Sequence, residues 1–169
     1  MKKLLLILPI FIFAFNIKQE YFSHNYQSVC KYGMNHFQKH NENLLSFIGY
    51  SCIKSDNLFY LPTIINNLKY TKEGRKNSIY FATLLLEKKL LLSYILDNTD
   101  ISYFRFPLLD HPISIVITNI INKNYKTENN IFIVNYKNKT YKIYGDKNSS
   151  KVFIDVYQDN NLIETHWYR

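Results

Sequence analysis

The chain has 169 residues, of which 47% are hydrophobic and 20% are charged, and its net charge is +8. It is long and apolar enough to form one hydrophobic core, which excludes a disordered acidic tail, a collagen-like repeat and a flexible linker. Its two cysteines are too few for a four-cysteine zinc ribbon or a cysteine-ligated iron–sulfur cluster.

The first residues have the composition of an export signal. Met1-Lys2-Lys3 is positively charged, and the 12 residues from Leu4 to Phe15 are apolar and uncharged. This run is shorter than the roughly 20 residues that a membrane-spanning helix needs. The sequence therefore predicts a signal peptide over residues 1–19, either cleaved or kept as an anchor, and a periplasmic location.

The positive charge of the chain does not indicate a nucleic-acid partner. Cleavage near residue 19 removes three lysines and lowers the net charge from +8 to +5. The remaining lysines are scattered, without a glycine-rich or RNA-binding motif, and we interpret them as solvent-facing charges. The leucine-rich stretch over residues 84–92 is interrupted by Glu87-Lys88-Lys89, so no transmembrane span is expected after the signal is removed.

The first part of the mature chain has the spacing of helices. Apolar positions three and four residues apart predict one helix over residues 22–37 and a second over residues 45–53. Asp56 is a candidate cap for a third helix over residues 58–68. Pro62 within that segment implies a late start or a kink.

The strongest helical pattern covers residues 72–97. Thr71 can cap this helix, and Glu73 in its first turn suits the positive end of the helix dipole. We expect it to be the central core helix. Another helix is predicted after Asp110, the candidate cap before His111-Pro112, although the many β-branched residues there also fit a buried strand.

The end of the chain changes to a pattern of strands. Turn sequences separate short segments rich in β-branched and aromatic residues, at residues 131–136, 140–144, 151–157 and 162–168. These segments predict a three- or four-stranded antiparallel meander. Alternation places Val152, Ile154 and Val156 on one face, which we expect to lie on the helices.

The sequence thus predicts an α+β fold, with a helical region over residues 20–124 and an antiparallel sheet over residues 125–169 packed on the helices. The helix pairs resemble tetratricopeptide or Sel1-like hairpins in length. Ile48-Gly49 and Cys52 resemble part of the Leu-Gly-x-x-Tyr pattern of those hairpins. The other consensus positions are missing, so the resemblance implies helical hairpins in style and not a repeat array.

Cys30 and Cys52 lie at equal distances along the chain from Asn41. If two helices turn back at Asn41, these cysteines face each other, and so do Gly33 and Gly49. Helices usually pack about 8 to 10 Å apart, which is too wide for a disulfide, but facing glycines permit a closer approach. In an oxidising compartment we expect a structural disulfide that closes a loop of 22 residues. Two unlinked buried thiols are the alternative.

No motif for catalysis or metal binding stands out. His36 and His40 are four residues apart, but two ligands do not make a metal site, so a solvated helix face is the interpretation. His111 is interpreted as a residue of a first helical turn, and His166 as a packed or surface residue of a strand. The sequence predicts no cofactor, no metal and no catalytic residue.

One short motif concerns covalent modification. Asp146-Lys147-Asn148-Ser149-Ser150 matches the extended acceptor pattern of the bacterial oligosaccharyltransferase of certain epsilon-class proteobacteria. With its export signal and its many Lys and Asn residues, the chain resembles the small periplasmic proteins of flagellated Campylobacter-type bacteria. The resemblance implies a glycan on Asn148. An ordinary polar turn is the alternative.

Two classes of function remain open. A non-enzymatic periplasmic structural or interaction protein agrees with the lack of a catalytic motif and with the aromatic content of 17%, and we favour it. The resemblance suggests an envelope protein complex as its partner, such as the periplasmic scaffold of the flagellar motor. The alternative is a small envelope hydrolase or small-ligand-binding protein with a site assembled from dispersed residues such as Tyr103, Arg105, Asp110 and His111.

Overall fold

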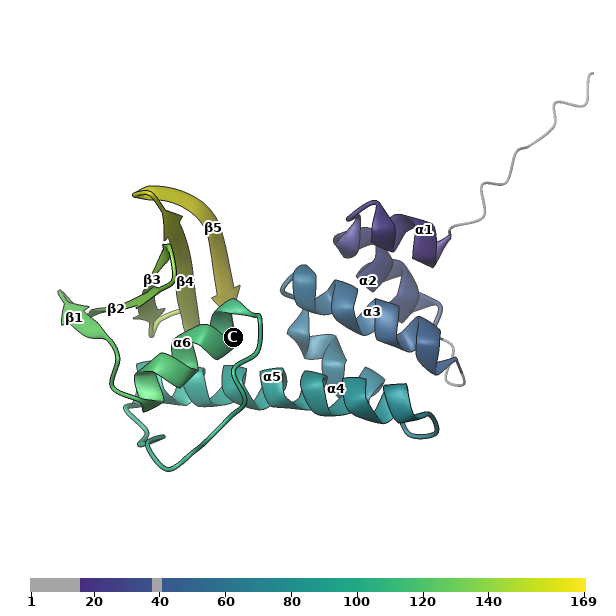
Figure 1. Ribbon diagram of the computed structural model, residues 1–169, viewed down its shortest axis with the longest axis horizontal. Helices are drawn as coiled ribbons and strands as arrows, with labels where there is room; N and C mark the ends of the chain where they lie inside the picture. The colour runs from purple at the N-terminus through teal and green to yellow at the C-terminus, as the bar shows by residue number, and fades with distance from the viewer. Residues whose placement is uncertain (1–15, 38–40) are drawn as a thin grey trace, which may run out of the picture.

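A computed structural model describes residues 16–37 and 41–169 and shows an α+β fold (Figure 1). The predicted fold class is confirmed, and the predicted signal peptide lies almost entirely outside the described residues. The helices are α1 (Ile17–Phe22), α2 (Tyr26–Asn35), α3 (Glu42–Lys54), the 3-10 helix η1 (Leu58–Tyr60), α4 (Leu61–Ile65), α5 (Lys72–Asp97) and α6 (Pro112–Ile121). Among these described elements, no helix is both long and apolar enough to cross a membrane.

The C-terminal part is an antiparallel sheet whose strands follow one another in chain order. It has one strand more than the four segments predicted, because the short β1 also pairs with β2. The strands are β1 (Lys126–Glu128), β2 (Ile131–Tyr136), β3 (Lys139–Asp146), β4 (Lys151–Gln158) and β5 (Asn161–Tyr168). Val152, Ile154 and Val156 of β4 are buried, as their alternation predicts.

Helix α5 connects the two parts of the molecule (Figure 1). Its N-terminal half lies against α3, where the ring of Phe81 fills the space over Gly49. Its C-terminal end lies against the sheet, where Ile95 and Leu96 contact Gly145 of β3. The helix is therefore the central core element that its apolar pattern predicts.

The start of α5 follows the prediction. Thr71 caps the helix, and its Oγ1 accepts a hydrogen bond from the Gly74 N–H at 2.9 Å. The carboxylate of Glu42, at the start of α3, accepts hydrogen bonds from the Tyr70 and Thr71 N–H groups at 2.6 and 2.7 Å. Hydrogen bonds from the Thr71 side chain and from these N–H groups lower the pKa of Glu42 to about 2. An ionised carboxylate thus holds the two helix starts together.

The start of α6 differs from the prediction by one residue. Residues 112–121 form a helix and not a buried strand, but its cap is His111 and not Asp110. The His111 Nδ1 accepts a hydrogen bond from the Ile113 N–H at 3.2 Å. Pro112 occupies the first helical position, where its missing N–H costs nothing, so the residue directly before it becomes the cap.

Two other helix boundaries also differ. The helix predicted over residues 22–37 corresponds to α2, which begins only at Tyr26, because His24 takes a left-handed conformation with φ 62° and separates α2 from α1. Asp56 is likewise left-handed, with φ 57°, and it ends the turn after α3 instead of capping the next helix. Pro62 lies in the first turn of α4, which agrees with the predicted late start.

Candidate functional site

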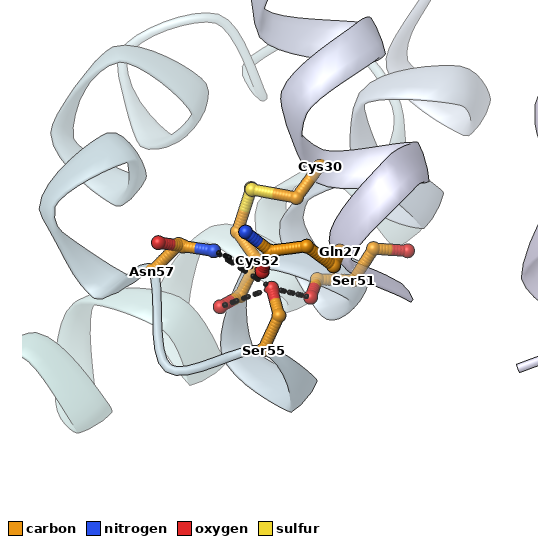
Figure 2. Close-up of a disulfide and its surroundings, with 6 residues drawn as sticks. All are labelled: Gln27, Cys30, Ser51, Cys52, Ser55 and Asn57. Atoms are coloured by element: carbon orange, nitrogen blue, oxygen red, sulfur yellow. Dashed lines mark hydrogen bonds between the residues drawn. A yellow bond between two sulfur atoms is a disulfide. The ribbon is translucent and has the colours of Figure 1, made fainter. Parts of the chain in front are cut away.

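The disulfide between Cys30 and Cys52 joins α2 to α3, and both residues are fully buried (Figure 2). Their Cα atoms lie 4.8 Å apart, so the helices approach closely here, as predicted. The glycines act differently from the prediction, because they do not form a facing pair. A Cβ on Gly33 would meet the side chain of Ile48, and a Cβ on Gly49 would meet Phe81 of α5.

The turn after α3 is tied to the disulfide-bonded helix pair (Figure 2). The Asn57 N–H donates to the carbonyl of Cys52 at 2.7 Å, and the Asn57 Nδ2 donates to the Gln27 Oε1 at 2.9 Å. The Ser55 hydroxyl donates to the carbonyl of Ser51 at 2.7 Å. These bonds fix both neighbours of Asp56, so the carboxylate of Asp56 has a defined position.

Asp56 contacts the last strand of the sheet. Its Oδ2 lies 2.8 Å from the His166 Nδ1, and its Oδ1 accepts a hydrogen bond from the Tyr168 hydroxyl at 2.8 Å. The other ring nitrogen of His166, Nε2, lies 3.0 Å from the Glu164 Oε2. We call Asp56, Glu164, His166 and Tyr168 the latch, because they join the helical region to β5.

The electrostatics of the latch favour a charged histidine. Burial by itself lowers the pKa of His166, but the hydrogen bond and charge of Asp56, together with Glu164, raise it above its ordinary value. Burial and the neighbouring Asp56 charge raise the pKa of Tyr168. An imidazolium can donate to both carboxylates at once, so the latch behaves as a structural ion pair.

His111 lies near the latch, but unlike His166 it has a lowered pKa. It is 6% exposed, and burial lowers its pKa to about 4, so it is neutral at physiological pH. Asp110, Tyr103 and Arg105, the other dispersed residues considered for a hydrolase, are exposed. The Arg105 guanidinium donates to the carbonyl of Ser102 at 2.7 Å, within its own loop. Within residues 16–37 and 41–169, no hydrogen bond or ion pair joins these four residues to one another.

A cleft of about 430 Å³ opens beside the latch. Its walls come from the turn after α3, from η1, from α5 and from the end of β5. Phe59 and Trp167, which are 62% and 51% exposed, contribute aromatic surface. The residues that line the cleft are Ser55, Asp56, Asn57, Phe59, Lys88, Thr165, Trp167, Tyr168 and Arg169.

Asn148, the candidate glycosylation site, is exposed in the turn between β3 and β4. Its N–H donates to the Asp146 Oδ1 at 3.0 Å, and the Ser149 hydroxyl donates to the Asp146 Oδ2 at 2.6 Å. The hydrogen bond from Ser149 lowers the pKa of Asp146. The acidic residue of the motif therefore shapes the turn that presents Asn148 to solvent.

The histidine pair considered for a metal is only partly within the described residues. His36 stacks on the ring of Tyr32, and its Nδ1 lies 3.0 Å from the Tyr32 carbonyl, whereas His40 lies outside the described residues. No group of three or more potential metal ligands occurs in residues 16–37 and 41–169.

Sequence reasoning missed the latch. It treated Asp56 as a helix cap and His166 as an ordinary strand residue. One signal was present in the sequence: Glu164, His166 and Tyr168 alternate along β5, so all three side chains lie on the same face of the strand. Their partner Asp56 could not be identified in this way, because it comes from a distant turn.

No protein family, curated protein or solved structure matches this chain. Its function is therefore inferred from its own residues.

Proposed function

We propose that this protein is a non-enzymatic periplasmic interaction protein, which docks on a larger envelope assembly through the free edge of β5. The observation that carries the proposal is the exposure of large apolar side chains on this strand. Leu162, Ile163 and Trp167 are 54%, 44% and 51% exposed. Apolar groups of this size on an edge strand are typical of an interaction site.

The backbone of β5 supports the same proposal. Within the described chain, β5 pairs only with β4, so its outer edge has unpaired N–H and C=O groups. Residues 161–165 are exposed on both faces of the strand. The register shifts between Val156 and Tyr157, and the far end of the β4–β5 hairpin curls away from the helices (Figure 1). A partner strand could add to this edge with backbone hydrogen bonds, while Leu162 and Ile163 provide specificity.

The disulfide supports the proposed compartment. Cys30 and Cys52 are joined and fully buried, and such structural bonds persist mainly in oxidising compartments such as the periplasm. The charged and apolar segments at the start of the sequence point to the same location.

The partner we propose is a component of a multiprotein envelope assembly. The resemblance to periplasmic proteins of flagellated bacteria makes the scaffold around the flagellar motor the first assembly to test. The latch supports a docking role, because it holds the base of β5 against the helices and leaves the exposed end of the strand available.

The test is site-specific photocrosslinking in the native host. A photoreactive residue at Ile163 should form a crosslink to one defined envelope protein. The same residue at Ile79, which is 69% exposed on α5, is the matched control and should not form that crosslink. A second variant, which carries Leu162→Lys in addition to the photoreactive residue at position 163, should lose this crosslink without a change in the thermal midpoint. Equal crosslinking at both positions, or none at Ile163, would overturn the proposal.

A further inference from the structure

Lys88 on α5 is a buried lysine with no counter-ion among the residues that the structure describes. It is 7% exposed, which departs from our expectation that the lysines face solvent. Within residues 16–37 and 41–169, its ammonium group forms no hydrogen bond or ion pair. Burial, followed by the charge of Lys89, lowers its pKa. The ammonium nitrogen is not one of the fully sequestered polar atoms, so an anion can reach it from the cleft, and the low exposure of Lys88 strengthens such a pairing.

The acid next to Lys88 in the chain does not compensate this charge. Glu87 accepts a hydrogen bond from the Ser114 hydroxyl at 2.9 Å, on the α6 side of the helix. Burial raises the pKa of Glu87 to about 7, so its carboxyl group is about half neutral at that pH. Lys88 instead lines the cleft beside the latch.

The other charges of the cleft leave it positive. Asp56 is its only acidic side chain in the described lining, and both oxygens of Asp56 are occupied by His166 and Tyr168. Arg169 adds a second cation to the lining. A third cation lies behind the aromatic wall, because the Lys151 Nζ is 4.2 Å from the ring centroid of Trp167.

The walls of the cleft suit an organic ligand better than a bare ion. Phe59 and Trp167 present exposed rings, and such rings pack well against flat hydrophobic groups. The volume of about 430 Å³ lies within the range of small-molecule sites. The other walls are polar, with the side chains of Ser55, Asn57 and Thr165, and such groups can orient a ligand whose flat body packs on the rings.

We propose that this cleft binds a small organic anion, a carboxylate or phosphate monoester with a flat hydrophobic body. Lys88 contacts the anionic group, and Phe59 and Trp167 contact the body of the ligand. This inference goes beyond the docking edge, because it depends on α5 and η1 and not on Leu162 or Ile163. A failed docking test would therefore leave it standing.

The single tryptophan of the chain makes the test direct. Trp167 lines the cleft, so its fluorescence should change saturably when the disulfide-bonded protein is titrated with phenyl phosphate or benzoate. Benzyl alcohol, which has the ring without the charge, should bind at least about tenfold more weakly. This comparison uses the unmodified protein and needs no variant.

Two matched variants identify the cation. Lys88→Met should weaken the binding of phenyl phosphate by about tenfold or more, whereas Lys89→Met, which removes an exposed charge one residue along α5, should leave it unchanged. The thermal midpoint of Lys88→Met should stay the same or rise, because an unpaired buried charge is removed. Equal binding of benzyl alcohol and phenyl phosphate, equal loss in both variants, or no saturable change with either anion would overturn the proposal.

Discussion

The Oδ2 of Asp56 and the Nδ1 of His166 lie 2.8 Å apart although 110 residues separate them in the chain. Asp56 belongs to the turn that follows the disulfide-bonded helix α3, and His166 belongs to the last strand. The bond therefore joins the helical region to the last strand of the described sheet. Asp56 also lines the cleft, so the latch and the proposed ligand site have this residue in common.

Breaking the latch should destabilise the whole fold. Asp56→Asn should lower the free energy of unfolding by about 1.5 to 3 kcal/mol, because the partly buried His166 then keeps only the more exposed Glu164 as a charged partner. His166→Gln should cost a similar amount, and the double variant should cost less than the sum of the two. Urea denaturation measures all three variants. Asp159→Asn, in an exposed turn, is the control and should change stability by less than about 0.5 kcal/mol. Strict additivity of the two latch variants would contradict the coupling.

Removing the disulfide should reduce the stability of the fold, because the bond has a structural role and not a catalytic one. Cys30→Ala with Cys52→Ala should lower the free energy of unfolding by about 2 to 5 kcal/mol, because the unfolded chain regains the freedom of a 22-residue loop. Reducing agent should destabilise the natural protein to a similar extent and leave the double variant unchanged. Labelling of unfolded, unreduced protein should find no free thiol. Two freely alkylated cysteines in protein isolated from the periplasm would show that the bond does not form there.

His111 should make the fold sensitive to acid. Its pKa is about 4 in the folded protein and 6.5 ordinarily, so the unfolded chain takes up the proton first. The contribution of neutral His111 to the free energy of unfolding is therefore fully present above pH 6.5 and is lost as the pH falls toward 4. His111→Asn keeps a capping side chain and should remove a pH-dependent loss of about 3 kcal/mol. Identical pH profiles of stability for the two proteins would contradict this assignment.

Glu87 should have the opposite effect on the pH dependence of stability. Its pKa is raised to about 7 from 4.5, so its stabilising contribution is present below pH 4.5 and is lost as the pH rises through 7. Glu87→Gln should therefore raise the free energy of unfolding above pH 7 by about 1 to 3 kcal/mol and change it little in acid. Thermal denaturation across pH measures the difference. Glu128→Gln, in exposed β1, serves as the control and should show no such dependence.

Asn148 should be modified in a host that contains the matching oligosaccharyltransferase. Asn148→Gln should then migrate faster on a denaturing gel, and mass spectrometry should find the glycan only on the natural peptide. Asp146→Asn should reduce the modification as well, because it removes the acidic residue of the motif. Asn138→Gln is the control, since the sequon at Asn138 has Tyr136 where the motif needs an acid. An unmodified Asn148 peptide would remove this support for the resemblance.

The sequence by itself predicted a structural element correctly wherever the pattern that specifies the element lies within a short stretch of the chain. Thr71 and the apolar period after it predict α5, and alternation in β4 predicts its buried face. The disulfide also followed from local information, because Cys30 and Cys52 are equally far along the chain from Asn41.

Only the tertiary structure decided what covers each element. Periodicity tells which face of a helix or strand is apolar, but it does not tell which distant segment packs there. Gly49 therefore packs against the ring of Phe81 and not against Gly33. Asp56 contacts the side chains of His166 and Tyr168 and does not cap a helix. Lys88 is buried for the same reason: its place on α5 is local, whereas its exposure depends on the turn after α3 and on β5, two segments distant in the chain that line the same cleft.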